Sequence, residues 1–359
     1  MAEDITVPDP SVVLELLTAF RSSKVMFAAV SLGVFDALES GPKTSAALAV
    51  ELGTNPDAIE RLLDTCVGLQ LMSRSVATSS LAPDLRPPTP VRYANTPAAE
   101  AYLTKASPRR LTGYINRSNE MMWLLWAHLE DAIREGTHRW KQTFGADGEI
   151  FAHFFHNEEA KHEFLMGMHG FGLISSPHVV SAFDLSRFRR LVDLGGATGH
   201  LAIAACQRWT QLETTVFDLP EAVPLAREIV GASPVAERIQ VVAGDFFVDP
   251  LPDADLYAVG RILHDWSEAK VVKLLGKIHE QLPPGGALLI AEKLLADDKS
   301  GPRWAQLQDL NMLTCTEGRE RTLAEYESLL RRVGFTTITA CRTPSPLDAV
   351  LARKHAPMT

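Results

Sequence analysis

Several features are scarce in this chain of 359 residues, and each scarcity argues against a class of protein. No uninterrupted apolar run is long enough to cross a bilayer, and the opening MAEDITVPDP lacks the basic and then apolar pattern of a secretion signal. The 4 cysteines stand far apart without a C-x-x-C pair, which argues against a disulfide framework or a zinc site and favours a reducing compartment. Basic residues are outnumbered, with 35 Lys and Arg against 44 Asp and Glu, so a nucleic-acid-binding face is not expected. We therefore expect a cytoplasmic protein that binds neither membrane nor nucleic acid.

The remaining composition is that of a globular protein with more than one core. Hydrophobic residues make up 46% of the chain and charged residues 22%, so sizeable packed cores are expected. The length exceeds what a single core usually supports. Changes of pattern along the chain predict a mainly helical domain over 1–110, a helical connector over 111–185 and an α/β domain over 186–359.

Residues 1–110 have the pattern of a winged helix. Apolar residues recur at helical spacing between positions 11 and 38. The segment TSAALAVELGTNPDAIERLLDTC then predicts two helices, the first capped by Thr44 and the second opened by Asn55 and Pro56. Short strands are expected on both sides of the proline-rich segment APDLRPPTP.

A winged helix raises the alternative of a transcription regulator. In a DNA-reading protein the second helix needs basic or amide groups that face bases and phosphates. Here that helix carries Asp57, Glu60 and Asp64 against the single Arg61, so a structural role is favoured. The helices predicted within residues 11–110 carry more apolar surface than a small domain can bury. The sequence therefore predicts a homodimer built on these residues.

The connector contains histidines that resemble metal ligands. His153, His156 and His162 recur at helical spacing, but no H-E-x-x-H pattern is present and Phe neighbours dominate, so a metal site is not expected. Met168, near His169 and Phe171, is expected to line an apolar substrate pocket, with plain core packing as the alternative.

From residue 190 onward, strand and helix patterns alternate. The segments LVDLG, TTVFDL, RIQVVAGDFF, DLYAVGRIL and GALLIAEKLL predict strands, and amphipathic helices separate them. Such alternation predicts a doubly wound, parallel α/β sheet whose ligand binds at the carboxyl ends of the strands.

A glycine-rich loop, DLGGATGH, closes the first of these strands. Its glycines allow the backbone to approach a ligand closely and to turn into a helix N-terminus. The spacing of Gly195, Gly196 and Gly199 does not match the dinucleotide fingerprint G-x-G-x-x-G.

Carboxylates at the strand ends narrow the choice of ligand. Asp193 lies within the first strand, Asp218 ends the second, and Asp245 follows the third beside Phe246. Asp218 is placed to accept both hydroxyls of a ribose, and Asp245 with Phe246 could bind an adenine. Lys or Arg groups that would hold phosphates are missing, so the pattern favours an adenosine without phosphates, and S-adenosylmethionine fits this description. The alternative is that Asp218 and Asp245 only cap the segments that follow them.

The fourth strand of this part ends in RILHDW, which places His264 and Asp265 at the rim of a core. Together with VDLGG, VFDLPE, GDFFVDPLPDADLY, LNMLTCTEGRERT and LDAVLARK, this motif resembles the plant- and animal-type O-methyltransferases over nearly the whole chain. Within that family, the resemblance is greatest to the hydroxyindole-methylating members. It implies a class I methyltransferase fold at the C-terminus, an N-terminal winged-helix-like dimerisation domain, and S-adenosylmethionine as the cofactor.

The resemblance also implies roles for individual residues. His264 matches the catalytic base, flanked by Glu292 and Glu320, and Asp265 and Asn311 match substrate contacts. The positions that match cofactor contacts are Gly195, Asp218, Asp245, Phe246 and Arg261.

Two residues depart from the family pattern. Relatives commonly carry a third consecutive glycine where this chain has Ala197, and a methyl group is tolerated there at negative φ. Hydroxyindole-methylating members carry an amide where this chain has Cys315, which affects the choice of substrate.

The implied chemistry explains a histidine between carboxylates. Methyl transfer from a sulfonium needs an acceptor that has lost its proton. A phenol with a pKa near ~10 and a histidine near ~6.5 leave a gap of about 3.5 pH units, or about 5 kcal/mol, which neighbouring carboxylates reduce. An aliphatic hydroxyl with a pKa near ~15.7 leaves about 12 kcal/mol. We therefore expect an aromatic hydroxyl as the acceptor, without a metal ion.

The acceptor could be a hydroxyindole, a flavonoid-like phenol or a polyketide phenol of secondary metabolism. An alternative function keeps the fold and cofactor but catalyses another reaction, as a hydroxylase or a pericyclase does. The presence of His264 and its carboxylates favours methyl transfer.

Overall fold

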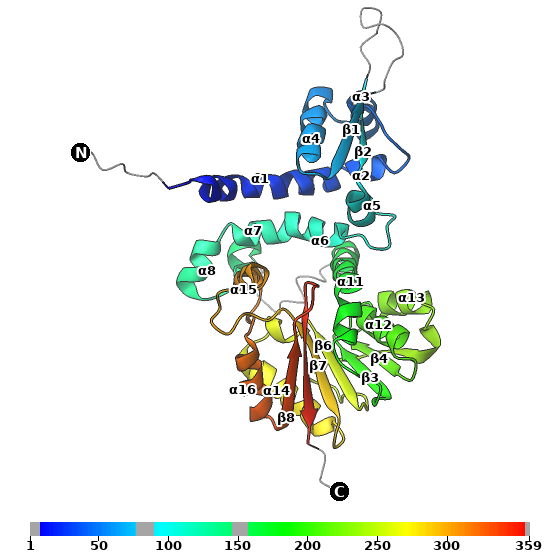
Figure 1. Cartoon of the computed structure of the whole chain (residues 1–359), viewed down its shortest axis with the longest axis vertical. Coiled ribbons are helices and arrows are strands. Elements are labelled where there is room, and N and C mark those ends of the chain that lie inside the picture. Colours follow the sequence, from blue (N-terminus) through cyan, green and yellow to red (C-terminus); the bar gives the residue numbers. More distant parts are fainter. Residues whose placement is uncertain (1–7, 77–89, 146–156, 356–359) are drawn as a thin grey trace, which may run out of the picture. The chain divides into compact units, whose positions relative to one another are not determined.

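The computed structural model describes residues 8–76, 90–145 and 157–355 (Figure 1). The chain forms two compact units, residues 1–119 and 120–359, which are described separately. The domain boundaries after residues 110 and 185 stay predictions. Most of the segment APDLRPPTP, together with His153 and His156, lies outside the described residues. No described helix combines the length and the apolarity that a bilayer crossing requires.

The N-terminal unit is a helical domain with a two-stranded antiparallel sheet. Its elements are α1 Ser11–Ser31, α2 Val34–Ala37, α3 Ser45–Leu52, α4 Pro56–Gly68, β1 Met72–Val76, β2 Val91–Asn95, α5 Pro97–Leu103 and α6 Thr112–Arg117. The side chains of Thr44 and Asn55 accept backbone N–H groups in the first turns of α3 and α4, as their capping role predicts. Gly53 ends α3 with φ 63°, a conformation that favours glycine. The predicted helix-turn-helix is therefore confirmed.

Helix α1 leaves most of its apolar side chains uncovered. Ala29 and Val30, near its C-terminal end, are buried in the core of the unit. Nearer its N-terminus, Val13, Leu17 and Phe20 are exposed by 68%, 64% and 54%. An apolar surface of this kind is typical of a protein–protein contact.

The larger unit begins with helices and continues into a sheet. A π-helical turn at Ser118–Met122 leads to α7 Trp123–Trp126, α8 Leu129–Glu135, α9 Trp140–Phe144 and α11 Glu158–Ser181. The strands that follow are β3 Arg190–Leu194, β4 Glu213–Asp218, β5 Ile239–Ala243, β6 Leu256–Gly260, β7 Ala287–Glu292, β8 Phe335–Cys341 and β9 Asp348–Lys354.

The strand order in this sheet is β5-β4-β3-β6-β7-β9-β8. The first five strands in that order are mutually parallel, as the alternating pattern predicts. The pairs of β9 with β7 and β8 are antiparallel, so the sheet is mixed at this edge and not parallel throughout. Loops at the carboxyl ends of β3, β4, β6 and β7 can therefore contribute to one site.

Two hydrophobic layers enclose the sheet. In β6, Tyr257 and Val259 pack with α14 Glu268–Gln281 and α16 Leu323–Arg332, whereas Leu256 and Ala258 pack with α12 His200–Arg208 and the end of α11. This alternation follows from the two-residue period of a strand. Figure 1 shows α14 and α16 on one side of the sheet and α12 with α13 Val223–Gly231 on the other.

Candidate active site

His264 lies in a tight turn directly after the carboxyl end of β6. The strand ends at Gly260, Arg261 takes φ 56°, and a 3-10 turn covers Leu263–Asp265. This turn brings the imidazole of His264 back toward the sheet, where only 4% of the residue is exposed. The sequence predicts this residue at a strand end, and the structure confirms that location.

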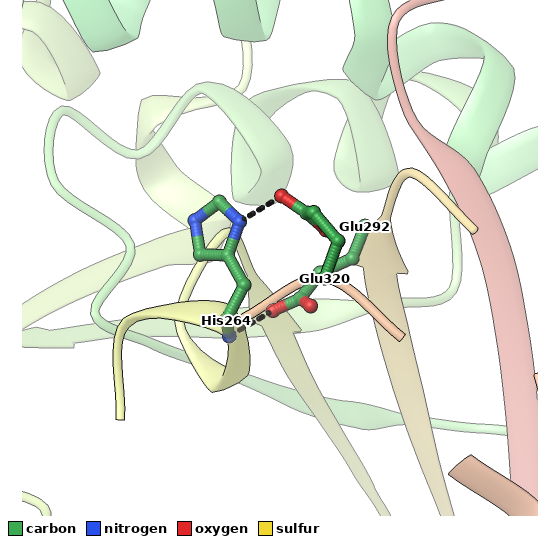
Figure 2. A group of neighbouring side chains, drawn as sticks. All are labelled: His264, Glu292 and Glu320. Atoms are coloured by element: carbon green, nitrogen blue, oxygen red, sulfur yellow. Dashed lines mark hydrogen bonds and ion pairs between the residues drawn. The ribbon is translucent and has the colours of Figure 1, made fainter. Parts of the chain in front are cut away.

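The imidazole is held by Glu320. Nδ1 of His264 lies 2.6 Å from Oε1 of Glu320, and Glu320 is itself only 2% exposed (Figure 2). An ionised carboxylate can only accept, so Nδ1 carries the hydrogen and Nε2 is the atom that can take up a further proton. Oδ1 of Asp265 lies 3.7 Å from Nε2. The arrangement is that of a base oriented by a carboxylate.

Glu292 binds the backbone of the same turn. Its Oε1 accepts the backbone N–H groups of Ile262, Leu263 and His264 at 3.2, 2.7 and 3.1 Å. Its Oε2 accepts the hydroxyl of Tyr326, and burial holds the pKa of that phenol well above its ordinary value, which keeps it a donor. Figure 2 shows Glu320 at the ring and Glu292 at the backbone of His264. The two glutamates therefore act on different parts of the histidine.

The surrounding charges determine the pKa of His264. Burial by itself would lower that pKa, because it disfavours the imidazolium. The negative charges of Glu320, Asp265 and Glu292 outweigh burial and raise the pKa of His264 to about 9. The imidazole is thus a stronger base than free histidine.

His264, Glu292 and Glu320 could also be considered as metal ligands. Within the part of the chain that the structure describes, they are the three residues whose donor atoms lie within 4.8 Å of one another. However, both oxygens of Glu292 already accept hydrogen bonds from the turn and from Tyr326. The donor set suits a proton better than a metal ion, and the absence of a metal stays a prediction.

Other residues of the GRERT segment hold the turn, and sequence analysis did not assign them. A Cβ on Gly318 would lie 2.2 Å from the carbonyl oxygen of His264, so only glycine permits this close approach. Arg321, 1% exposed, donates to the carbonyl of Leu263 at 3.0 Å. The motif itself was a signal, because a glycine and an arginine on either side of an assigned glutamate suggest close packing.

The glycine-rich loop after β3 has a left-handed backbone at three positions. Gly195 has φ 66°, Gly199 has φ 78° and Ala197 has φ 50°. The expectation that Ala197 takes a negative φ is therefore wrong. The reason is visible in the loop, because this conformation directs the N–H of Ala197 to Oδ2 of Asp218 at 2.7 Å.

Two carboxyl groups at the carboxyl ends of β3 and β4, those of Asp193 and Asp218, have raised pKa values. Asp193 is 2% exposed, and burial together with the charge of Asp218 raises its pKa to about 8. Burial also raises the pKa of Asp218 to about 6, although the N–H groups of Ala197 and Leu219 oppose the shift. Oδ2 of Asp193 has no hydrogen-bond partner among the described residues. A bound cationic or hydrogen-bonding group would relieve these costs.

The predicted adenine contacts lie next to the same loop. A Cβ on Gly195 would be 3.5 Å from the ring of Phe246, which shows how closely they approach. Oδ1 of Asp245 accepts the N–H of Phe247 at 2.7 Å, so the capping alternative describes part of its role. Arg261 places its guanidinium 4.9 Å from the ring centroid of Phe171, and its buried Nε has no partner within the described ranges.

The predicted substrate contacts lie on helices. Asn311, on α15 Arg303–Cys315, accepts the indole N–H of Trp126 at 2.8 Å through Oδ1. Met168 is half-buried on α11, next to His169, whose Nδ1 lies 2.8 Å from the hydroxyl of Thr198 in the glycine-rich loop. His162 is exposed, and its Nδ1 lies 3.9 Å from Oε1 of Glu163. This pair by itself does not form a metal site.

The sheet order, the glycine-rich loop and the strand-end carboxylates define a class I methyltransferase. The comparisons agree: residues 126–336 match the O-methyltransferase domain, and residues 14–105 match the O-methyltransferase dimerisation domain. The chain belongs to this O-methyltransferase family and is an S-adenosylmethionine-dependent O-methyltransferase.

The relatives match at nearly full length. The chain is 40% identical over 348 residues to acetylserotonin O-methyltransferase of Gallus gallus, covering 96% of this chain and 97% of that protein. It is 38% identical to a probable bifunctional dTTP/UTP pyrophosphatase/methyltransferase protein of Homo sapiens, of which it spans 55%. The crystal structure of human N-acetylserotonin methyltransferase in complex with SAM superposes with a TM-score of 0.90 at 36% identity, covering 98% of this chain and 99% of that chain.

Proposed function

We propose that this enzyme methylates an aromatic hydroxyl with His264 as the general base, and that a hydroxyindole is its acceptor. The observation that carries the proposal is the buried ion pair of His264 and Glu320 at the carboxyl end of β6. The hydroxyindole class is supported by the relatives named for acetylserotonin, which match over nearly the whole chain.

The raised pKa of His264 suits this class of acceptor. With a pKa of about 9 for the imidazole, transfer from a phenol of pKa ~10 is uphill by about one pH unit, or about 1.4 kcal/mol. Transfer from an aliphatic hydroxyl of pKa ~15.7 would still cost about 9 kcal/mol. A hydroxyindole or another phenol is therefore favoured over an alcohol.

The remaining site residues divide by what they would contact. Glu320 orients the ring, Glu292 positions the turn, and Oδ1 of Asp265 lies 3.7 Å from Nε2. Gly195, Asp218, Asp245, Phe246 and Arg261 would hold the cofactor: the carboxylates accept its hydroxyl and amino groups, and Phe246 packs on its base. S-adenosylmethionine supplies a methyl group on a positively charged sulfur. Asn311 and Met168 would contact the acceptor.

The uncovered face of α1 supports a homodimer through the N-terminal domain. The apolar residues between Val12 and Phe20 are those that a second copy would bury. Sedimentation that shows a monomer at micromolar concentration would contradict this assembly. We also place the enzyme in the cytoplasm and its reaction in secondary metabolism, as the sequence suggests.

A methyl-transfer screen tests the proposed reaction. The purified enzyme is incubated with S-adenosylmethionine and, in separate reactions, with hydroxyindoles, flavonoid-like phenols, polyketide phenols or aliphatic alcohols. The masses of the products are measured by mass spectrometry. A mass gain of one CH₂ on a hydroxyindole, from a methyl group that replaces the hydroxyl hydrogen, supports the proposal. Methylation of alcohols alone, or hydroxylated products, would contradict it.

A further inference from the structure

Some buried polar atoms near the site have no hydrogen-bond partner among the described residues. They include Asp193 Oδ2, Arg261 Nε, Glu320 Oε2 and Gln308 Nε2. A buried polar group without a partner is costly, so each of these atoms calls for an explanation. Asp193 lies in β3 directly before the glycine-rich loop. Arg261 and Glu320 belong to groups that the proposed function places at the cofactor or at the base. Gln308, which is 8% exposed, has no part in it.

Gln308 lies on α15 beside residues that already belong to the site. Its neighbour Asp309 accepts the backbone N–H of Glu320 at 2.9 Å, which links the helix to the base. One turn earlier, Trp304 stacks on Phe171 with ring centroids 5.8 Å apart. Residues 304, 308, 311 and 315 follow helical spacing, so they share one face of α15.

At the other end of this face, the side-chain amide of Asn311 has a fixed orientation. An indole N–H can only donate, so the hydrogen bond from Trp126 directs the side-chain oxygen of Asn311 toward the indole. The NH₂ group of Asn311 is therefore the group that can donate to a ligand. The nearest partner of that NH₂ is the weak acceptor Sγ of Cys315 at 3.7 Å. The hydrogen-bond partners of Asn311, Cys315 and Trp126, belong to an apolar cluster that includes Met122. This face therefore offers N–H donors within apolar surroundings.

We propose that Gln308 is a specificity-determining residue whose side-chain amide, together with Asn311, binds a hydrogen-bond-accepting group of the acceptor molecule, such as a carbonyl oxygen. This inference rests on the proposed function. A carbonyl oxygen accepts two hydrogen bonds and so gives Nε2 of Gln308 the partner that it lacks. An acceptor without such a group leaves the amide buried and unpaired.

Two acceptors with the same reacting hydroxyl test this role. We compare a 5-hydroxyindole that bears an acetamide side chain with the same 5-hydroxyindole without it. Gln308→Leu, which keeps the size but removes the amide, should lower kcat/KM about 3- to 10-fold for the first acceptor, mainly through KM, and not for the second. The control is Gln306→Leu on the same helix, whose amide donates to the carbonyl of Lys299 at 2.9 Å; it should change neither.

The outcomes separate this inference from the proposed function. Equal losses for both acceptors in Gln308→Leu, or no loss for either, would overturn the role of Gln308. Methylation of neither acceptor by the native enzyme would overturn the proposed function itself. Equal unfolding midpoints for the native enzyme and both variants establish that the comparison is between folded proteins.

Discussion

The turn after β6 and the glycine-rich loop after β3 lie at the carboxyl ends of neighbouring strands, but they are stabilised in opposite ways. In the turn, Glu292 collects three backbone N–H groups and the hydroxyl of Tyr326, and Glu320 orients the ring of His264. In the loop, Ala197 is held at φ 50°, and the buried Asp193 has an unpartnered oxygen.

The difference shows how each region prepares for its ligand. The base is positioned by the protein's own groups, so its geometry exists before an acceptor binds, which is the arrangement that catalysis by a fixed group requires. The loop contains a strained residue, Ala197, and an unpartnered carboxylate oxygen on Asp193 that a bound ligand could satisfy. Changes in the turn should therefore affect turnover and stability, and changes in the loop should affect cofactor binding.

The largest expected effect follows from removing the base. His264→Ala should lower turnover by about 10²- to 10⁴-fold. Cofactor affinity should stay nearly unchanged, because alanine keeps the backbone N–H that Glu292 accepts. Above pH 9, where the base is neutral in both enzymes, Glu320→Gln should lower turnover less than His264→Ala does, since it removes support for the base and not the base itself. Steady-state kinetics with calorimetry of cofactor binding checks both, and near-native turnover in His264→Ala would refute the mechanism.

Glu292 should matter more for stability than for binding the cofactor. Glu292→Gln removes the charge that strengthens four hydrogen bonds and should lower the free energy of unfolding by about 2–3 kcal/mol. Tyr326→Phe, which removes one of the four, should cost about 1 kcal/mol. Thermal and urea unfolding measure both changes. A Glu292→Gln variant as stable as the native enzyme would show that the carboxylate does not organise the turn.

In the loop, the effect should appear in binding. Asp218→Ala should weaken S-adenosylmethionine binding by about 1.5–3 kcal/mol, the value of a hydrogen bond to a charged group. The matched control is Glu221→Ala, an exposed carboxylate three residues further on. Calorimetry that finds unchanged affinity in Asp218→Ala would remove the ribose assignment.

The smallest effect concerns the strained backbone of the loop. Ala197→Gly should raise the free energy of unfolding by up to about 1 kcal/mol, because glycine adopts a positive φ without strain and this gain exceeds its larger entropy loss. Ala58→Gly, at an exposed position in the first turn of α4, should lower it by up to about 1 kcal/mol. If both variants lose stability equally, φ 50° at Ala197 is not strained.

Local chemistry made much of the fold predictable. Neighbouring residues in the sequence determine the caps at Thr44 and Asn55 and the alternation of strands and helices. The structure contains both features. The antiparallel direction of β9 was not predictable in the same way, because strand direction depends on pairing with β7 across the sheet. The positive φ of Ala197 depends on a hydrogen bond to Asp218, 21 residues away.

The site was predictable only where its residues lie in recognisable local motifs. Its motifs pointed to His264 and the strand-end aspartates, but Glu320 is 56 residues from His264 and was assigned through the family resemblance. Tyr326 and Gly318 were missed because their roles arise only when the GRERT segment packs against the turn. Spacing along the chain does not encode such contacts.

We infer that the charge of Glu320 raises the pKa of His264 and so tunes it as the base, and the pH profile of kcat/KM measures this effect. Since the pKa of His264 is raised to about 9, the neutral base is scarce at pH 7, and kcat/KM should rise about tenfold per pH unit until it levels off near pH 9. Glu320→Gln removes the largest charge that favours the imidazolium, so its profile should level off at least about one pH unit lower. Glu317→Gln, whose carboxylate pairs with Lys270 at the surface, should keep the native profile. A profile that is flat, or one that Glu320→Gln leaves unmoved, would contradict the claim.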